Sequence, residues 1–298
     1  MLAASMKPEK GQSIETLNYP VIASCKFDGI RCVIVNGKAK SRTLKDIPND
    51  YIRKQLSRIE YEGFDGEILT YTDGVMDDFN IVSGKVMRQT GTPDFVYHVF
   101  DLCNVDDDYV DRIGQYQARA DGLTTLSEVS PVDTVLCLTP SDLEAFTEKC
   151  LTDGFEGAIV RHPQGCYKQG RSTWREGGMT KIKPFEDAEA VITGFEEQMA
   201  NNNAKVVNEL GRNKRTSHKA GKTGKDTLGK FICRSKEFGE IKVGTGKGLT
   251  QALRQEIWDN QAKFKGKTIT YKFQRIGMKA GGKPRIAVFK GFRHKHDI

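Results

Sequence analysis

The chain has 298 residues, 38% of them hydrophobic and 29% charged, and its formal net charge is +7. This composition is typical of soluble folded proteins, and the length suffices for two domains that each bury a core. Charged residues interrupt the first ten positions and no run of about 18 apolar residues follows, so we expect neither a signal peptide nor a membrane-spanning helix.

The first part of the chain mixes strand-like runs with helical patterns. We expect strands at 21–24, 32–35, 66–71, 95–102 and 157–161, and helices at 49–59, 111–123 and 141–152. Ser141 and Glu144 have the spacing of a capping box, so the last helix is expected to begin at Ser141. We interpret Arg112, Arg119 and the acidic run 106–108 as a solvated loop and helix surface.

The remaining part is dominated by strands separated by glycine-rich turns. Strands are expected at 189–195, 228–234, 240–243, 267–274 and 285–292, and one helix at 250–264. About five strands and one helix predict a small closed barrel such as the OB-fold. The polar, glycine-rich segment 201–226 is predicted to be a basic loop, and a loop this long is usually functional or disordered.

The positive charge is unevenly distributed along the chain. Residues 1–187 hold 22 Lys and Arg against 29 Asp and Glu, a net charge of −7, whereas residues 188–298 hold 24 against 10, a net charge of +14. This asymmetry is typical of a polyanion-binding module attached to a domain with another task, although a solvated basic face is the alternative. We therefore predict two domains, 1–187 and 188–298.

The seven cysteines contain no Cys-x-x-Cys pair. Their spacing does not suit a zinc clamp or a redox motif, so we expect no structural zinc. Reduced thiols in an intracellular protein, in the cytoplasm or nucleus of a host, are the expected state.

Three short motifs have charged residues two positions apart, which places both side chains on one face of a strand. They are Lys26-x-Asp28, Asp65-x-Glu67 and Lys181-x-Lys183, and a fourth motif sets Glu156 between Gly154 and Gly157 at the start of an apolar strand. In one pocket, neighbouring cations would make the amine form of Lys26 more accessible, so that it could act as a nucleophile. A phosphate ester with Mg²⁺ suits such a pocket, while a Schiff-base lysine is the competing chemistry.

Six motifs, in this order, resemble those of the covalent nucleotidyltransferases and, within them, the ATP-dependent DNA ligases. They are KFDGIR at 26–31, SRT at 41–43, FDGE at 64–67, YHVFD at 97–101, GFEG at 154–157 and TKIKP at 180–184. Segments 167–173 and 284–297 are similar to the small viral or phage members of the chlorella-virus type. The resemblance implies an α+β fold: a nucleotidyltransferase domain with antiparallel sheets and flanking helices, followed by an OB-fold barrel.

The resemblance also implies a role for each matching residue. Lys26 is implied to be the nucleophile that forms lysyl-AMP. The residues implied to bind the nucleotide are Ser24, Cys25, Arg31, Glu67, Phe100 (by stacking on adenine), Arg171, Lys181, Lys183 and Arg285. The implied ligands of Mg²⁺ or Mn²⁺ are Glu67 and Glu156. The residues implied to bind DNA are Arg42 together with Lys214, Arg215, Lys219 and Lys222 of a basic latch; Asp297 belongs with Arg285 to the last motif.

These roles imply a DNA ligase that uses ATP and acts as a monomer on nicked duplex DNA. Lys26 is adenylated with release of pyrophosphate, AMP passes to the 5′-phosphate of the nick, and the 3′-hydroxyl displaces AMP. An RNA ligase or mRNA guanylyltransferase shares the Lys-x-Asp-Gly signature and is the alternative. A non-catalytic nucleic-acid-binding protein is the third hypothesis.

Overall fold

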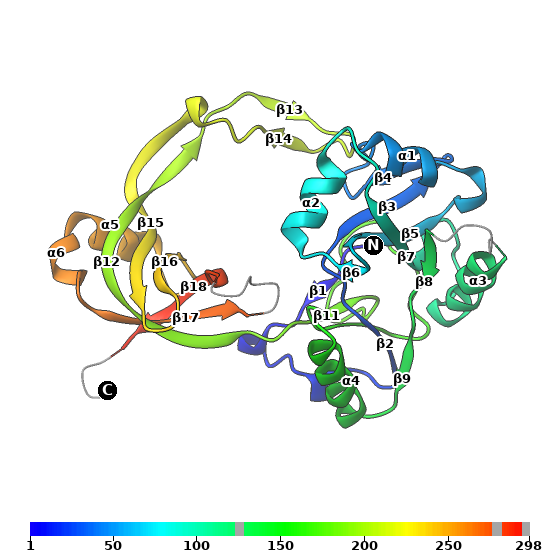
Figure 1. Ribbon diagram of the computed structural model, residues 1–298. Coiled ribbons are helices and arrows are strands. Elements are labelled where there is room, and N and C mark those ends of the chain that lie inside the picture. The colour runs from blue at the N-terminus through cyan, green and yellow to red at the C-terminus, as the bar shows by residue number, and fades with distance from the viewer. Residues whose placement is uncertain (123–127, 276–281, 294–298) are drawn as a thin grey trace. The chain divides into compact units, whose positions relative to one another are not determined.

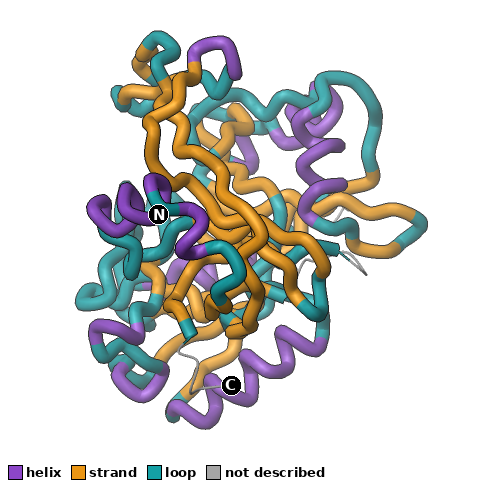
Figure 2. Tube along the Cα trace, turned by 90° about the vertical axis from the view of Figure 1, so that its left-hand side faces the viewer, coloured by secondary structure: helices purple, strands orange, loops and turns teal. Residues whose placement is uncertain are grey.

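The structure is a computed structural model that describes residues 1–122, 128–275 and 282–293. It divides the chain into two compact units, Met1–Lys183 and Pro184–Ile298 (Figure 1). The division falls just before the boundary predicted at Asp187, because strand β12 (Glu186–Asn201) of the second unit has already begun there. Strands and helices are both plainly present (Figure 2), and the α+β class is confirmed. Within the described ranges, no helix has the length and apolar character needed to cross a membrane.

One sheet of the first unit carries a large hydrophobic core. Its strands, in spatial order, are β4 (Lys38–Ser41), β3 (Ile30–Val35), β5 (Phe64–Thr72), β7 (Asp94–Leu102) and β8 (Val129–Pro131), with β6 (Val75–Met76) beside β5. The helices α1 (Asp50–Leu56), α2 (Phe79–Met87) and α3 (Tyr109–Asp121) contribute Ile52, Val82 and Tyr116 to this core. All three side chains are fully buried, so the helices fix the sheet from which several site residues project.

The second sheet of this unit brings distant segments of the chain together. Its order is β1 (Ala4–Ser5), β11 (Thr180–Ile182), β10 (Ala158–Arg161), β2 (Val21–Cys25) and β9 (Val135–Cys137). Helix α4 (Pro140–Thr152) packs on this sheet through Leu143. The predicted cap at Ser141 is wrong: Thr139 is the N-cap and forms the capping box with Asp142, because Pro140 already occupies the first helical turn.

Short elements complete the first unit and differ from the predicted pattern. Single 3-10 turns lie at η1 (Pro8–Lys10), η2 (Ile14–Thr16) and η3 (Ile59–Tyr61). The helix predicted to reach residue 59 therefore ends at Leu56 and is followed by η3. Helix α2 was not predicted; its N-cap Asp78 accepts hydrogen bonds from the backbone N–H groups of Asn80 and Ile81.

The second unit is a closed five-stranded barrel, as predicted. The order is β12, β15 (Lys222–Ser235), β16 (Gly239–Gly244), β18 (Arg285–Phe292) and β17 (Thr268–Gln274). Its core includes Phe231 and Tyr271, both fully buried. The predicted helix 250–264 is divided at Asn260 into α5 (Gln251–Asp259) and α6 (Gln261–Phe264).

Segment 201–226 is not the irregular loop that the sequence predicts. It contains the antiparallel hairpin β13 (Lys205–Val207) and β14 (Asn213–Arg215), and the 3-10 turn η4 (Lys219–Gly221). Arg215 donates hydrogen bonds to the carbonyl oxygens of Asn201 and Asn203, at 2.8 and 2.9 Å. These bonds order the base of the hairpin although few apolar side chains are buried there.

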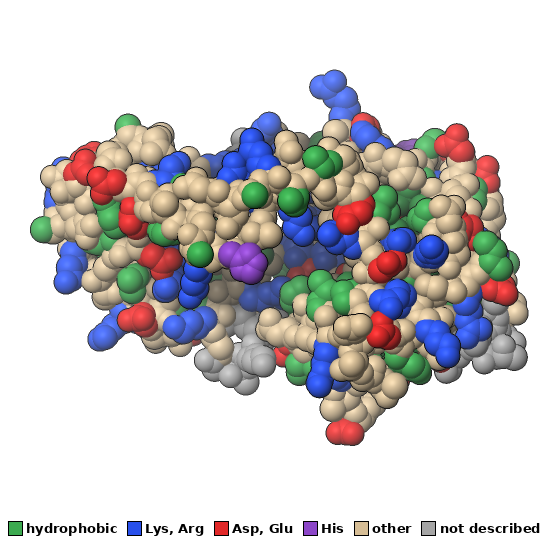
Figure 3. Space-filling model, turned by 90° about the horizontal axis from the view of Figure 1, so that it is seen from above, with side chains coloured by type: hydrophobic (Ala, Val, Ile, Leu, Met, Phe, Trp, Pro, Cys, Tyr) green, Lys and Arg blue, Asp and Glu red, His purple; other side chains and the backbone are tan. Residues whose placement is uncertain are grey.

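Many cations of the barrel are paired with carboxylates of the same unit. Figure 3 shows Lys and Arg side chains (blue) close to Asp and Glu side chains (red). The pairs are Lys230 and Lys242 with Glu196, Arg275 with Glu186 and Glu237, Lys263 with Glu256, Lys290 with Asp187, and Arg293 with Glu189. The charges of these cations are therefore neutralised locally, and Lys214 of the hairpin and Lys219 of η4 are exposed cations outside these pairs.

Asn49 allows a test of this architecture. Its buried side chain accepts from the backbone N–H of Ile52 at 2.9 Å and donates to the carbonyl oxygens of Arg88 and Gly91 at 3.1 and 3.2 Å. We expect Asn49→Ala to lower the free energy of unfolding of the first unit by about 2–4 kcal/mol, because one cap is lost and two carbonyls lose a donor. Calorimetry of the full chain measures this. Thr250→Ala, which removes one exposed cap, should cost only about 1 kcal/mol; equal effects would contradict the prediction.

Candidate active site

A lysine and carboxylate cluster lies where three motifs of the first unit meet. The Nζ atoms of Lys26 and Lys183 both form ion pairs with Oε2 of Glu156, the second at 2.6 Å. The Glu156 side chain is only 5% exposed, whereas those of Lys26 and Lys183 are 21% and 15% exposed. A buried carboxylate is thus shared by two ammonium groups that still reach solvent.

Backbone geometry explains why these residues meet. Lys26 directly follows β2, its N–H donates to the carbonyl of Gly157 at 2.9 Å, and the N–H of Glu156 donates to the carbonyl of Lys26 at 3.1 Å. Gly157 has φ +135°, and a Cβ there would lie 2.2 Å from the carbonyl oxygen of Ile182. Only glycine allows this approach of the Glu156 turn to the strand that leads to Lys183.

The cluster shifts the acid and base strength of its members. Burial lowers the pKa of Lys181, and the nearby charges of Lys183 and Lys26 lower it further. Burial also lowers the pKa of Lys183, although its contact with Glu156 opposes this. For Glu156 burial raises the pKa, but Lys26 and Lys183 outweigh it and hold the pKa below its usual value. The site therefore keeps the Glu156 carboxylate ionised near Lys181 and Lys183, two lysines that lose protons more readily than usual.

A second group of charges lies on strands β3 and β5. Arg31 stands opposite Glu67 in the strand register, and its guanidinium binds both carboxylate oxygens of the fully buried Asp65. Burial raises the pKa of Glu67 to about 7, and Arg31 and Lys26 only partly offset this. The Tyr167 hydroxyl also donates to Asp65 at 2.7 Å. Asp65 lies in the FDGE motif and Tyr167 in segment 167–173, but neither was predicted to belong to the site.

The Phe100 ring is close to two arginines. The guanidinium carbons of Arg31 and Arg161 lie 4.9 and 5.6 Å from the centre of its ring. Arg161 and Arg112 both pair with the buried Asp101. The expectation that Arg112 is solvated is wrong, since its side chain is fully buried. The sequence signal for its burial was Asp101 in the YHVFD motif, because a buried carboxylate requires a cation.

A row of aromatic side chains lies next to Lys26 and was not predicted from the sequence. The rings of Phe27 and His98 stack with centres 4.6 Å apart, and Phe155 meets Phe27 edge-on at 5.3 Å. His98 stands opposite Glu67 in the register of β5 and β7, and burial lowers its pKa to about 4. The residues that follow Lys26 and precede Glu156 are therefore in contact through their side chains.

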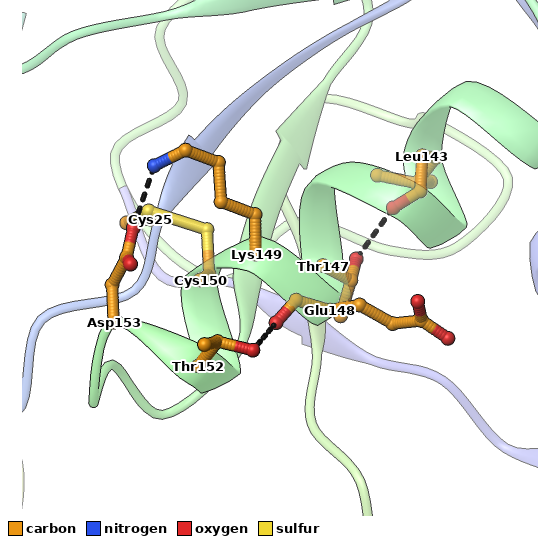
Figure 4. The surroundings of a disulfide bond; sticks show 8 residues. All are labelled: Cys25, Leu143, Thr147, Glu148, Lys149, Cys150, Thr152 and Asp153. Carbon is orange, nitrogen blue, oxygen red and sulfur yellow. Dashed lines mark hydrogen bonds and ion pairs between the residues drawn. A yellow bond between two sulfur atoms is a disulfide. The ribbon is translucent and has the colours of Figure 1, made fainter.

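Cys25 forms a disulfide with Cys150 of α4 (Figure 4). The expectation that all thiols are reduced is therefore wrong for this pair, because the end of β2 and the last turn of α4 place the two Cα atoms 5.6 Å apart, within disulfide range. The other five cysteines, all within the described residues, are free. A contact of Cys25 with a nucleotide would accordingly use its main chain.

The other predicted residues have varied positions. Ser24 is buried and pairs with Ile159 across the sheet. Arg171 is exposed, donates to the carbonyl of Ala3 at 2.7 Å, and contributes to the lowered pKa of Lys181. Arg42 is exposed in the turn after β4.

The predicted residues of the second unit lie on the barrel and its hairpin. Arg285 begins β18, and Lys222 begins β15. Lys214, Arg215 and Lys219 belong to the hairpin segment. Asp297 lies outside the described residues.

The carboxylates present are compatible with Mg²⁺. Among the described residues no group of three or more His, Cys, Asp or Glu side chains is placed to hold a metal. Magnesium in nucleotide enzymes commonly uses only one or two carboxylates and takes its remaining ligands from phosphate and water. Glu67, whose raised pKa a cation would offset, and Glu156 both interact electrostatically with Lys26, so they are two carboxylates available to such an ion.

Comparison with known proteins identifies both units. Residues 1–183 match the family described as "ATP dependent DNA ligase domain", and residues 221–293 match "DNA ligase OB-like domain". The adenylated DNA ligase of chlorella virus is 26% identical, with a TM-score of 0.54 and 98% of each chain covered. A Lig E DNA ligase shares the fold at 20% identity, with a TM-score of 0.71 and 98% of each chain covered.

Curated relatives are longer proteins. A DNA ligase of African swine fever virus is 25% identical over 282 residues, which cover 87% of this chain and 58% of that protein. A probable DNA ligase of Mycolicibacterium vanbaalenii is 30% identical over 131 residues, 42% of this chain and 24% of that protein. The matches thus span about a quarter to three fifths of these relatives.

The raised pKa of Glu67 predicts a stability effect with a defined sign. An acid whose pKa rises from 4.5 to about 7 on folding favours the folded state when protonated, and that contribution is lost as the pH rises from 4.5 through 7. We therefore expect Glu67→Gln to stabilise the first unit at pH 8 by about 1–3 kcal/mol, and by much less near pH 5. Melting temperatures at both values test this. Glu60→Gln, at an exposed side chain, is the control and should have little effect.

Proposed function

Since the chain belongs to the ATP-dependent DNA ligase family, we propose that it seals nicks with a 3′-hydroxyl and a 5′-phosphate in duplex DNA, through lysyl-AMP and adenylated DNA. The observation that carries the proposal is the contact of Lys26 with Glu156, which is also bound by Lys183. This cluster joins a nucleophile, a carboxylate and a phosphate-binding cation in one place, as covalent transfer of a nucleotide requires.

In the first step, Lys26 in its amine form attacks the α-phosphate of ATP. A phosphoramidate bond forms, pyrophosphate leaves with the electrons of the broken bond, and the lysine loses a proton. Lys181 and Lys183 carry the charges that offset the growing negative charge on the phosphate oxygens. Lys26 is held at its carbonyl and its N–H by the Glu156 turn, so positioning supplies much of the rate.

The nucleotide itself is proposed to lie over the faces of β5 and β7. Glu67 is proposed to accept a hydrogen bond from the ribose, and the Phe100 ring is proposed to stack on adenine. Ser24 and the main chain of Cys25 flank the base, while Arg171 and Arg285 are assigned to the phosphates. When bound by Glu67 and Glu156, Mg²⁺ or Mn²⁺ supplies positive charge to the phosphate oxygens.

In the later steps, the adenylated enzyme acts on DNA. The 5′-phosphate oxygen of the nick attacks AMP and displaces Lys26, and the 3′-hydroxyl then attacks that phosphate and releases AMP. The DNA backbone is proposed to be held by Arg42 and by four cations of segment 201–226: Lys214, Arg215, Lys219 and Lys222. Arg31 is proposed to lie near the 5′-phosphate. We propose that the protein works as an intracellular monomer without structural zinc.

Labelling of the protein tests the first step. Incubation with Mg²⁺ and ATP labelled at the α-phosphate should give a covalent adduct that survives denaturation, because the phosphoramidate is a covalent bond. Lys26→Ala should give none, whereas Lys168→Ala, which alters an exposed ion pair outside the cluster, should label normally.

The same assay separates the alternatives. Labelling by GTP in place of ATP would favour an mRNA guanylyltransferase, and sealing of nicked RNA but not DNA would favour an RNA ligase. A wild-type protein that binds a nick but forms no adduct would favour the non-catalytic hypothesis.

The hairpin predicts a salt effect. Lys214→Ala with Lys219→Ala should lower the slope of log affinity for nicked DNA against log salt by about 2, because each phosphate contact releases about one counterion. Self-adenylation should be unchanged. The matched control is Lys242→Ala with Lys263→Ala, where both cations already face a carboxylate. Binding titrations at several salt concentrations measure this, and equal slopes in both double variants would exclude the assigned role.

A further inference from the structure

The Cys25–Cys150 disulfide lies next to both members of the catalytic ion pair. Cys25 is the last residue of β2 and directly precedes Lys26. Cys150 lies in the last turn of α4 (Figure 4), and Glu156 follows shortly after the end of this helix. The bond therefore links the two segments on which Lys26 and Glu156 are mounted.

Hydrogen bonds close this linkage into a ring. The carbonyl of Cys150 accepts from the N–H of Phe155 at 2.8 Å, and the N–H of Glu156 donates to the carbonyl of Lys26 at 3.1 Å. The ring runs from Lys26 to Cys25, through the disulfide to Cys150, across to Phe155, and through Glu156 back to Lys26. The disulfide is the covalent cross-link in a ring otherwise closed by hydrogen bonds.

The helix end that carries Cys150 is itself well held. Cys150 is fully buried, Lys149 pairs with Asp153 at 2.6 Å, and the Thr152 hydroxyl donates to the carbonyl of Glu148 at 3.0 Å (Figure 4). The disulfide to this helix end therefore restricts the position of Cys25. The Cys25 side chain lies on the opposite face of β2 from Ser24, so the cross-link does not occupy the face proposed to bind the nucleotide.

We propose that Cys150 is a positioning residue for Lys26: through its disulfide with Cys25 it holds the Lys26–Glu156 pair in register for attack on the nucleotide. The inference rests on the proposed function and assigns to that site a dependence on the thiol state. When the bond is reduced, the segment that bears Lys26 is held there by hydrogen bonds and packing alone, and adenylation slows.

The redox step balances with a thiol–disulfide couple. Two thiols, on Cys25 and Cys150, each lose one proton and one electron, and a small disulfide such as oxidised glutathione accepts them and is cleaved to two thiols. A dithiol such as dithiothreitol reverses the step. Cys25 is half-buried whereas Cys150 is fully buried, so we expect a small reagent to attack the bond at Cys25.

A thiol count tests the bond. After equilibration with oxidised glutathione and removal of the reagent, the denatured protein should show five free thiols, and seven after reduction. Seven thiols before reduction would overturn the proposal. Mass spectrometry of the Cys25 and Cys150 peptides identifies the pair, and a bond between any other cysteines would also overturn it.

Single-turnover self-adenylation tests the positioning role. Oxidised wild type should form the adduct about 5- to 20-fold faster than reduced wild type at saturating ATP. The final adduct amplitude and the ATP concentration at half-maximal rate should be unchanged. A merely structural bond would change the amplitude, by changing the folded fraction, and leave the rate constant unaltered; that result, or equal rates, overturns the proposal.

Two variants complete the test. Cys150→Ser should adenylate at the rate of the reduced wild type with or without reductant, whereas Cys166→Ser, which lacks an exposed free thiol, should keep the response of wild type. A response that persists in Cys150→Ser, or disappears in Cys166→Ser, overturns the assignment. Absence of any adduct in both thiol states contradicts the proposed function instead, so the two failures are distinguishable.

Discussion

The first unit depends on one electrostatic constraint, the burial of the Glu156 carboxylate between the ammonium groups of Lys26 and Lys183. A buried carboxylate is stable only when cations and hydrogen bonds compensate its lost hydration. Three segments must therefore lie next to one another in the folded chain: the end of β2, the turn after α4, and the residue after β11. The strand order β11, β10, β2 and the open backbone of Gly157 are what allow this.

Further buried charges are paired around this centre. Asp65 binds Arg31, and Asp101 binds Arg161 and Arg112. A network of paired charges in a low-dielectric interior is rigid, because each charge would be costly to leave alone. The partly exposed lysines are thus supported by buried groups that do not move easily, which is the condition for preorganised electrostatic catalysis.

The sequence predicted the parts of this site that follow local rules. Alternation predicted that Lys181 and Lys183 share one face of a strand; Lys183 pairs with Glu156, and the charge of Glu156 also acts on Lys181. The five barrel strands follow from their apolar runs and glycine turns. Arg112 was misjudged because a helical surface pattern does not show that Asp101, on another strand, needs a partner. The Cys25–Cys150 bond depends on the contact of β2 with α4, which no spacing rule specifies. Hairpin 205–215 was missed because main-chain and side-chain hydrogen bonds stabilise it without an apolar pattern.

The second sheet has a consequence for the order of folding. In this sheet, β1 at the start of the chain pairs with β11 near residue 180. Strand β2 pairs with β10 and β9, which are both synthesised much later. At about 5–20 residues per second of synthesis, strand β2, which directly precedes Lys26, emerges many seconds before its partner strands exist. Pairings of such long sequence separation form slowly. Lys26 is therefore synthesised early, but the cluster around it forms late. A nascent chain released before residue 183 contains Lys26 but lacks Lys183 of that cluster.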